Sequence, residues 1–93
     1  MMVKRELISA LKASFPEINR NDIVLIVNTM FETMANALIR GETIDLRGIG
    51  RFKVKERRPI RIINPRSKTP LLIPKRWTVH FKPADSLKRR IQG

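Results

Sequence analysis

The first half of the chain repeats its apolar residues at the spacing of α-helices. Leu7, Ile8, Leu11 and Phe15 lie three or four positions apart, so one side of a helix would carry them all. The pattern predicts a helix from about residue 3 to residue 14, and Pro16 breaks the pattern just beyond it.

A second and longer helix is predicted from about residue 20 to residue 40. Asn19 is suited to cap its N-terminus, and Asp22 lies in the first turn, where a carboxylate is favourable. Gly41 is suited to end the helix, because glycine readily adopts the left-handed conformation that follows many helices. At about 1.5 Å per residue, the helix would be roughly 30 Å long.

This second helix is apolar around more of its circumference than the first helix can cover. A surface helix usually has an apolar stripe about 100° wide or somewhat more. Here one stripe consists of Ile23, Ile26, Val27, Met30, Met34 and Leu38, and it is widened by Val24, Phe31, Ala35 and Ile39. We expect the uncovered part to form a self-complementary interface in a dimer. The alternative is a single well-covered core helix, which needs more covering elements than 93 residues supply.

The second half of the chain changes to the alternation of β-strands. Residues 43–46 and 51–55 alternate apolar and polar side chains, and residues 48–50, Gly-Ile-Gly, are suited to a tight turn between them. The pattern predicts a hairpin that turns four apolar side chains inward and its charges outward. These inward residues are Ile44, Leu46, Phe52 and Val54.

Two further elements follow near the C-terminus. Residues 77–81 return to a strand pattern, and Pro83 precedes a short closing helix over about residues 84–91, with Leu87 and Ile91 on its inner face. The expected dimer core combines the second helix with the sheet. It consists of Ile26, Met30, Phe31, Met34, Leu38, Phe52 and Phe81.

Residues 57–76 have a composition unlike the rest of the chain. They contain four prolines, seven basic residues and no acidic residue. Proline cannot donate to a central ladder, so the segment cannot be interior sheet, yet aliphatic residues alternate along it at 60, 62, 71 and 73. A two-stranded ribbon that turns near residues 64–67 satisfies both facts, with limbs about 25 Å long. Such a ribbon is marginal in water by itself, so we expect it to be mobile alone and ordered on a partner.

These elements predict one α+β domain over residues 1–93. Its fold class has two N-terminal helices, a three-stranded antiparallel sheet with a long β-hairpin arm, and a short C-terminal helix. Within it we expect a helical dimerisation part at 1–41, the sheet with its arm at 42–82 (the arm at about 57–76), and the C-terminal helix at 83–93.

The charge is concentrated in the second half. Residues 1–50 carry six basic and six acidic residues, whereas residues 51–93 carry fourteen basic and two acidic ones, so the whole net charge of +12 lies there. Such a distribution favours a polyanionic partner, because neutralising phosphates releases condensed counterions. The alternative is a solvated basic surface that only keeps the protein soluble.

Composition also limits the other function classes. The chain has no cysteine and one histidine, His80, so we expect no metal site, no disulfide and no cofactor. A chain of 93 residues has a thin core, which again favours a dimer. Charge begins at the fourth residue, and uninterrupted apolar runs are no longer than five residues. We therefore expect no targeting segment, no membrane association, no small-molecule substrate, and a cytoplasmic location.

Several motifs together resemble the bacterial HU and integration host factor family of histone-like DNA-binding proteins. They are Gly48-Ile49-Gly50-Arg51-Phe52, Arg57, Pro59, Asn64-Pro65, His80-Phe81-Lys82-Pro83 and the helix with Leu87-Lys88. The resemblance covers essentially the whole chain. It implies an intertwined dimer that binds double-stranded DNA with two β-arms in the minor groove and bends it, in the nucleoid or as an accessory to transcription, replication or recombination. A homodimer and a heterodimer with a related subunit both remain open.

The resemblance also implies roles for individual residues. Pro65 would intercalate between base pairs as a wedge, and Asn64 would set the tip of the arm. Arg61 and Arg66 would lie in the minor groove. The remaining implied DNA contacts are Lys53, Lys55, Arg57, Arg58, Lys68, Lys75 and Arg76 along the saddle and arm, Lys82 and Lys88 on the flanks, and Arg47 beside the turn.

The arm departs from the family pattern at its tip. The family has glycine and arginine before Asn-Pro, whereas this chain has Ile62 and Ile63. The usual Thr-Gly turn after the tip is also missing. Ile63 either adds an apolar contact to DNA beside the wedge or packs within the ribbon, and both interpretations remain open here.

Two other function classes are weaker. The segment from Arg47 to Val54 superficially echoes an aromatic RNA-recognition motif, so a small RNA-binding or ribosome-associated protein is the alternative. However, Ile49 stands where an aromatic residue should stack. An enzyme is not expected, because no nucleophile–base pair, phosphate loop or metal cluster emerges and no catalytic residue can be assigned.

Overall fold

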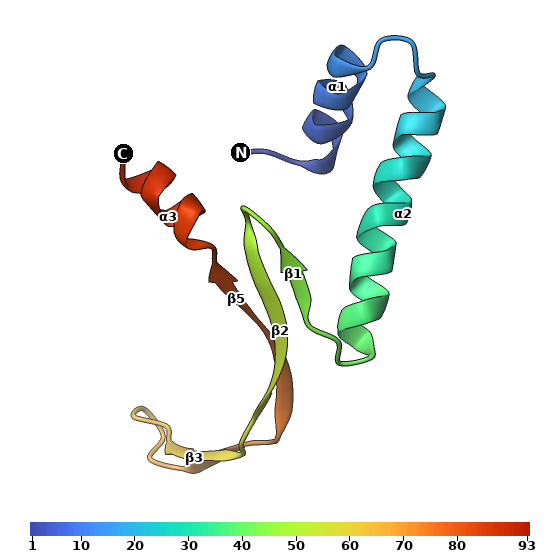
Figure 1. Ribbon diagram of the computed structural model, residues 1–93. Coiled ribbons are helices and arrows are strands. Elements are labelled where there is room, and N and C mark those ends of the chain that lie inside the picture. The colour runs from blue at the N-terminus through green and yellow to red at the C-terminus, as the bar shows by residue number, and fades with distance from the viewer. The chain divides into compact units, whose positions relative to one another are not determined.

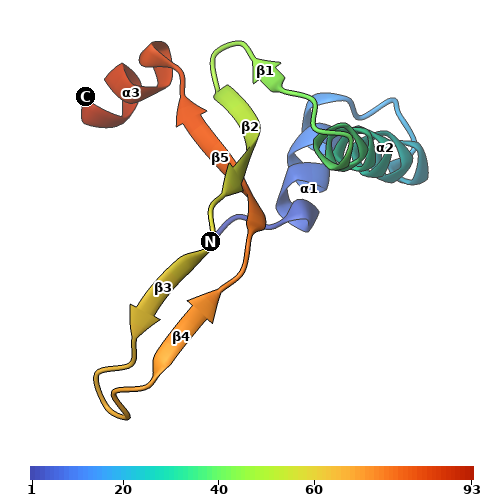
Figure 2. The ribbon, with the colours of Figure 1, turned by 90° about the horizontal axis from the view of Figure 1, so that it is seen from below.

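The order of helices and strands agrees with the sequence prediction. A computed structural model describes residues 1–93 and divides them into two compact units, Met1–Asn36 and Ala37–Gly93. The elements, shown in Figure 1 with β4 labelled in Figure 2, are α1 (Lys4–Ser14), α2 (Arg20–Ile39), β1 (Ile44–Leu46), β2 (Gly50–Arg57), β3 (Ile60–Ile63), β4 (Pro70–Ile73), β5 (Arg76–Pro83) and α3 (Asp85–Gln92).

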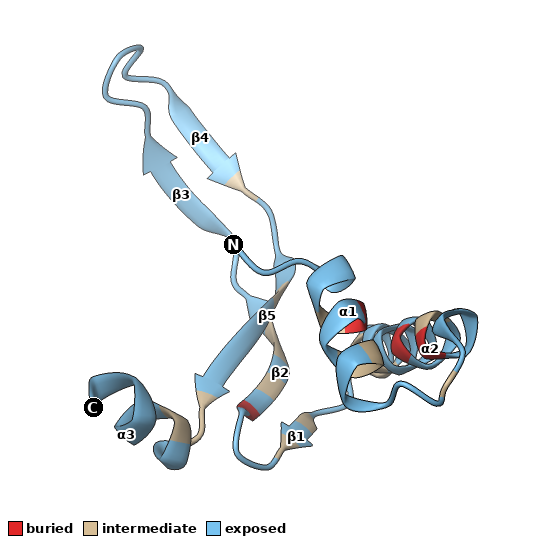
Figure 3. Ribbon diagram, turned by 90° about the horizontal axis from the view of Figure 1, so that it is seen from above, coloured by how far each residue is buried: buried red, intermediate tan, exposed pale blue.

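The first unit has a small core between α1 and α2. Its buried side chains are Ile8, Ile23 and Val27, against which Leu11, Ile18 and Val24 pack. Figure 3 shows this burial as the red patches on the two helices. The turn between the helices is held by Lys12, whose Nζ donates to the carbonyl oxygens of Pro16 and Ile18 at 2.7 Å each.

Both predicted caps of α2 are present. The Asn19 side chain accepts a hydrogen bond from the backbone N–H of Asn21 at 2.8 Å, which satisfies one of the free donors of the first turn. At the other end Gly41 has a φ of 82°. The N–H of Gly41 donates to the carbonyl of Leu38, and the N–H of Glu42 donates to the carbonyl of Ala37. These two hydrogen bonds form a Schellman motif.

Only part of the apolar surface of α2 is covered within one chain. Ile23 and Val27 are buried, but Ile26 is 56% exposed and Met30 is 49% exposed. By length and composition alone α2 could also cross a membrane, although its uninterrupted apolar runs are no longer than five residues. The helix meets this criterion because the polar residues between its apolar runs are uncharged over most of its length.

The second unit contains a three-stranded antiparallel sheet in the order β1-β2-β5. Ile44 faces Phe52 across β1 and β2, and Phe52 faces Phe81 across β2 and β5. The backbone N–H of Ala84 donates to the carbonyl of Ile49 at 2.9 Å, which fastens the β1–β2 turn to the start of α3.

The arm is a separate two-stranded sheet, β3 with β4. Figure 2 shows it as an extension beyond β2 and β5. The predicted two-stranded ribbon is confirmed, with Ile60 facing Ile73 and Ile62 facing Leu71. Its paired strands have only four residues each, so they are shorter than the predicted limbs of about 25 Å. The loop between them is longer than the predicted four-residue turn, since it occupies residues 64–69.

The closing helix α3 begins after Ala84 and ends at Gln92. Leu87 is partly buried, as predicted. Ile91 was predicted on the inner face, but within one chain it is 74% exposed. The spacing of four residues places Leu87 and Ile91 on one side of the helix, but no element of the same chain covers its last turn.

Candidate nucleic-acid interface

The pairing of β2 with β5 sorts their side chains into two chemically different faces. Residues directly opposite in an antiparallel pair point to the same side of the sheet. The facing pairs Arg51–Lys82, Lys53–His80, Lys55–Thr78 and Arg57–Arg76 therefore share one side. We call this side the basic face. It carries six lysine and arginine residues on two strands of eight residues each.

The opposite side, the apolar face, holds the pairs Phe52–Phe81, Val54–Val79 and Glu56–Trp77. The rings of Phe52 and Phe81 lie 4.8 Å apart between centroids at an interplanar angle of 44°, an arrangement that favours aromatic pairs. The strands thus separate charge from hydrophobic surface completely except at Glu56. The predicted inward residues of β2, Phe52 and Val54, both lie on the apolar face.

Lys75 does not join the basic face. Its Nζ lies 2.9 Å from Oε1 of Glu56 and 5.5 Å from the centroid of the Trp77 ring. Both partners belong to the apolar face, so the structure engages the Lys75 ammonium on the side opposite to Arg57 and Arg76. The sequence prediction that Lys75 follows phosphates with its neighbours ignored this alternation.

Two contacts orient side chains on the basic face. Arg57 Nε donates to Thr78 Oγ1 at 3.0 Å. Arg51 Nη2 donates to Oδ2 of Asp45 on β1 at 3.0 Å. Both pairs are exposed, so the ion pair contributes little stability. Their effect is to hold two guanidinium groups against the sheet.

Arg51 and Thr78, which the register places on the basic face, were not among the residues predicted to contact DNA. Arg51 lies two residues before Lys53 on the same strand, so the alternation of a β-strand could have placed it on the same side as Lys53 and Lys55. Thr78 could not be found this way, because its place on the basic face depends on the β2–β5 register. His80 also lies on the basic face, opposite Lys53.

The arm tip is organised by Asn64. Its side-chain Oδ1 accepts from the backbone N–H of Arg66 at 2.9 Å, across Pro65. Its backbone N–H donates to the carbonyl of Thr69 at 3.0 Å, and its carbonyl accepts from Lys68 at 2.7 Å. Lys68 has a φ of 55°, so it occupies the left-handed conformation that favours glycine. Pro65 is thereby held at the exposed end of the ribbon.

The remaining predicted residues lie around these two regions. Arg61 is in β3, and Arg66 and Lys68 are in the tip loop. Arg58 lies between the two ladders and Arg47 lies in the β1–β2 turn. Lys82 lines a polar hollow of about 250 Å³ with Asp45, Arg51 and Asp85, and Lys88 is exposed on α3.

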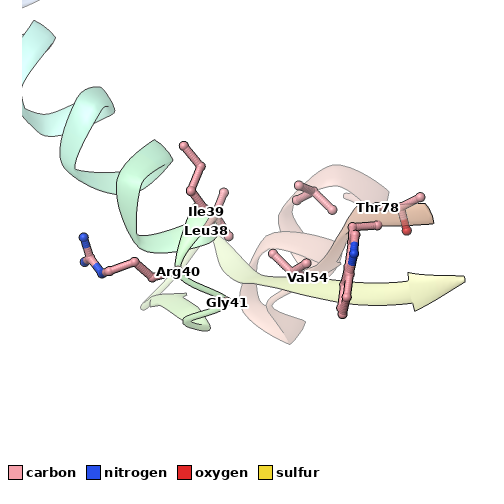
Figure 4. Close-up of a pocket in the computed structure, with 8 residues that line it drawn as sticks. Leu38, Ile39, Arg40, Gly41, Val54 and Thr78 are labelled. Atoms are coloured by element: carbon pink, nitrogen blue, oxygen red, sulfur yellow. The ribbon is translucent and has the colours of Figure 1, made fainter. Parts of the chain in front are cut away.

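A larger, apolar hollow lies on the apolar face. It has a volume of about 530 Å³ and is lined by Leu38, Ile39, Arg40, Gly41, Val54, Trp77, Thr78 and Val79. Figure 4 shows Leu38 and Ile39 at the end of α2 beside Val54 of β2. Ile39 is 82% exposed, so this hollow is open apolar surface rather than a closed core. No group of three or more His, Cys, Asp or Glu side chains lies close enough to hold a metal ion.

Residues 2–92 match the family described as Bacterial DNA-binding protein. The chain is 38% identical to integration host factor subunit beta of Burkholderia cenocepacia (strain HI2424) over 93 residues, 99% of this chain and 86% of that relative. It is 40% identical to the same subunit of Paraburkholderia phytofirmans over 91 residues, 97% of this chain and 84% of that relative.

Solved structures show the same fold. A cocrystal structure of Anabaena HU with DNA superposes with a TM-score of 0.83 at 22% identity, covering 97% of each chain. An HU mutant from Thermotoga maritima superposes with a TM-score of 0.67 at 29% identity, covering 97% of this chain and 99% of the other.

Proposed function

The chain belongs to the bacterial DNA-binding protein family, and we propose that it acts as an architectural protein that binds duplex DNA along the basic face and bends it at the arm tips. The observation that carries this proposal is the separation of the two sides of the β2–β5 ribbon, with six cations on one side. Cations fixed on a sheet at intervals of two residues can follow a row of phosphates.

The tip supports the bending part of the proposal. Pro65 is exposed at the end of the arm, and Arg66 and Lys68 follow it in the same loop. An apolar ring at such a place can enter a base step and unstack it, at a cost of a few kcal/mol that wider backbone contact offsets. The Asn64 hydrogen bonds hold the wedge in place before DNA arrives.

The exposed apolar surface supports a dimer. Ile26, Met30 and Phe31 on α2 are uncovered within one chain, as is the apolar hollow lined by Leu38 and Val54. Soluble proteins rarely leave such surface open. We propose a homodimer whose core includes these residues with Met34, Phe52 and Phe81. Pairing with a related subunit is the other arrangement, and sedimentation equilibrium of the purified chain separates a self-associating protein from one that stays monomeric alone.

We propose that the protein works in the nucleoid, within the cytoplasm, because packaging and bending of DNA are the activities that the basic face and the arms support. No catalytic group is assigned to it. The RNA-binding alternative is weaker, since the aromatic residues of the β2–β5 ribbon, Phe52, Phe81 and Trp77, all lie on the apolar face and leave the basic face without a platform for stacking bases.

The test is a bending assay. A duplex labelled at both ends with a donor and an acceptor dye is titrated with the protein, and the end-to-end distance is followed by energy transfer. We expect the two labelled ends of the duplex to move closer together as the complex forms. Binding without approach contradicts bending, and stronger binding to structured RNA than to duplex DNA contradicts the choice of partner.

A further inference from the structure

The β2–β5 ladder and the arm ladder have a common register. Arg57 faces Arg76 at the end of the first ladder, and Ile60 faces Ile73 at the start of the second. Two residues separate the ladders on each strand: Arg58 with Pro59 on one, and Pro74 with Lys75 on the other. Neither strand gains a residue, so the interruption is not a bulge. It arises because Pro59 and Pro74 stand opposite each other and neither can donate a hydrogen bond.

A common register lets the alternation of faces continue into the arm. From β2 into β3, Arg61 and Ile63 continue the two-residue alternation of Lys53, Lys55 and Arg57. From β4 into β5, Pro70 and Leu72 stand in the same two-residue alternation as Arg76 and Thr78. The facing pairs Arg61–Leu72 and Ile63–Pro70 confirm that these four share one side of the arm. This side therefore continues the basic face, while the pairs Ile60–Ile73 and Ile62–Leu71 continue the apolar face.

The outer part of this side is apolar and open. Ile63 is 70% exposed and Leu72 is 61% exposed, against 43% for Ile62 and 49% for Leu71 on the other side. The most exposed aliphatic side chains of the arm thus lie on the side that continues the basic face. Exposed aliphatic groups are unfavourable in water, and burying them against another apolar surface is favourable.

We infer that Ile63 and Leu72 are DNA-contacting residues that bind the minor groove through apolar contact, next to the Pro65 wedge. The inference rests on the proposed function, because it takes DNA as the partner of the basic face. Charge complementarity supports this occupant, since residues 57–76 carry seven basic and no acidic residues. The walls of the minor groove are sugars, which offer apolar surface between the phosphates, and an unstacked base step offers more.

This contact differs from the contacts of the inner ribbon. Lysine and arginine on phosphates give a salt-dependent free energy. Aliphatic groups on sugars and bases contribute a free energy that salt leaves almost unchanged, with a negative heat-capacity change on binding. Ile63 and Leu72 therefore set the part of the affinity that persists at high salt.

Two matched double variants test the inference. Ile63→Ala with Leu72→Ala removes one isoleucine and one leucine from the side that continues the basic face. Ile62→Ala with Leu71→Ala removes the same atoms from the opposite side. Affinity for a duplex is measured over a series of salt concentrations, and binding enthalpy is measured at several temperatures.

We expect the first variant to bind roughly tenfold more weakly at every salt concentration. Its salt slope should be unchanged and its heat-capacity change on binding less negative than that of the wild type. The second variant should bind within about twofold of the wild type. Single Ile63→Ala and Leu72→Ala variants should each show part of the loss.

Equal losses in both double variants would show that only the stability of the arm matters, and would overturn the inference. Wild-type affinity in the first variant would do the same. A wild-type protein that neither binds nor bends duplex DNA would instead refute the proposed function, so the two failures are distinguishable.

Discussion

The inner ribbon of β2 with β5 and the outer ribbon of β3 with β4 share a register but differ in chemistry. The inner ribbon carries its cations on one side and its apolar residues on the other. The outer ribbon carries aliphatic residues on both sides, and only Ile73 among them is partly buried. The inner ribbon can therefore pack against other parts of the protein and bind phosphates at once. The outer ribbon has no partner within its own chain, so its aliphatic surface is open to a ligand.

The largest expected effect comes from a change that damages the inner ribbon itself. A Cβ at Gly50 would lie 2.4 Å from the Lys82 carbonyl oxygen and 2.7 Å from the Phe81 ring, at a φ of 154°. We expect Gly50→Ala to lower the free energy of unfolding by about 3 kcal/mol, measured by urea denaturation at fixed protein concentration.

Gly48→Ala is the matched control for this change. Gly48 also has a positive φ, 85°, but nothing lies within 4 Å of its added Cβ. Only the backbone strain applies, so the cost should be about 1 kcal/mol. Equal costs at the two positions would contradict the close contact between β2 and β5.

Loss of charge from the inner ribbon should have the next largest effect. Lys53→Ala with Lys55→Ala removes four cations from a dimer. We expect duplex affinity to fall roughly 100-fold at moderate salt, and the slope of log affinity against log salt to become shallower by about 3.6. Arg5→Ala with Arg20→Ala, which removes as many cations from the first unit, should leave the slope unchanged.

Removal of the wedge should affect shape more than affinity. Pro65→Ala keeps every charge of the arm, so we expect the salt slope to persist while the bend, measured by energy transfer between the duplex ends, decreases clearly. Ser67→Ala, from the same loop, should bend DNA like the wild type. A Pro65→Ala complex as bent as the wild type would contradict the role of the proline ring.

The smallest expected effect is the change in salt slope when one of two neighbouring cations on opposite sides of the ribbon is removed. Arg76 lies on the basic face, whereas Lys75 contacts Glu56 and Trp77 on the other side. Arg76→Ala should reduce the salt slope by about 1.8 per dimer, and Lys75→Ala by well under half of that. Identical slopes for the two variants would remove the distinction between the faces.

Periodicity was sufficient to predict the elements but not their contacts. The helices, the strands and both caps of α2 followed from spacing and from Asn19 and Gly41, because these signals are local. The position of Lys75 required the register between β2 and β5, which depends on pairs 19 to 33 residues apart in the sequence. The exposure of Ile91 was missed for a related reason, since helical spacing identifies a face but not whether another element covers it.

The arm shows the same limit in the candidate site. Its charge and prolines marked it as a DNA-binding ribbon from the sequence, and its limbs and Pro65 tip could be located. The side on which Ile63 lies could not be decided, because that required the number of residues between the two ladders on each strand. The structure supplies this number, with Pro59 opposite Pro74.

The most direct test of arm binding in the minor groove is to map the positions of the arm tips on bound DNA by cleavage. The natural chain has no cysteine, so Ser67→Cys provides one attachment site at each tip for an iron chelate that cleaves nearby deoxyribose. We expect two clusters of cleavage per bound dimer, each offset across the strands toward the 3′ side, as cleavage from the minor groove requires. Cleavage with the opposite offset, or no cleavage in a complex shown to be fully bound, would contradict arm binding in the minor groove.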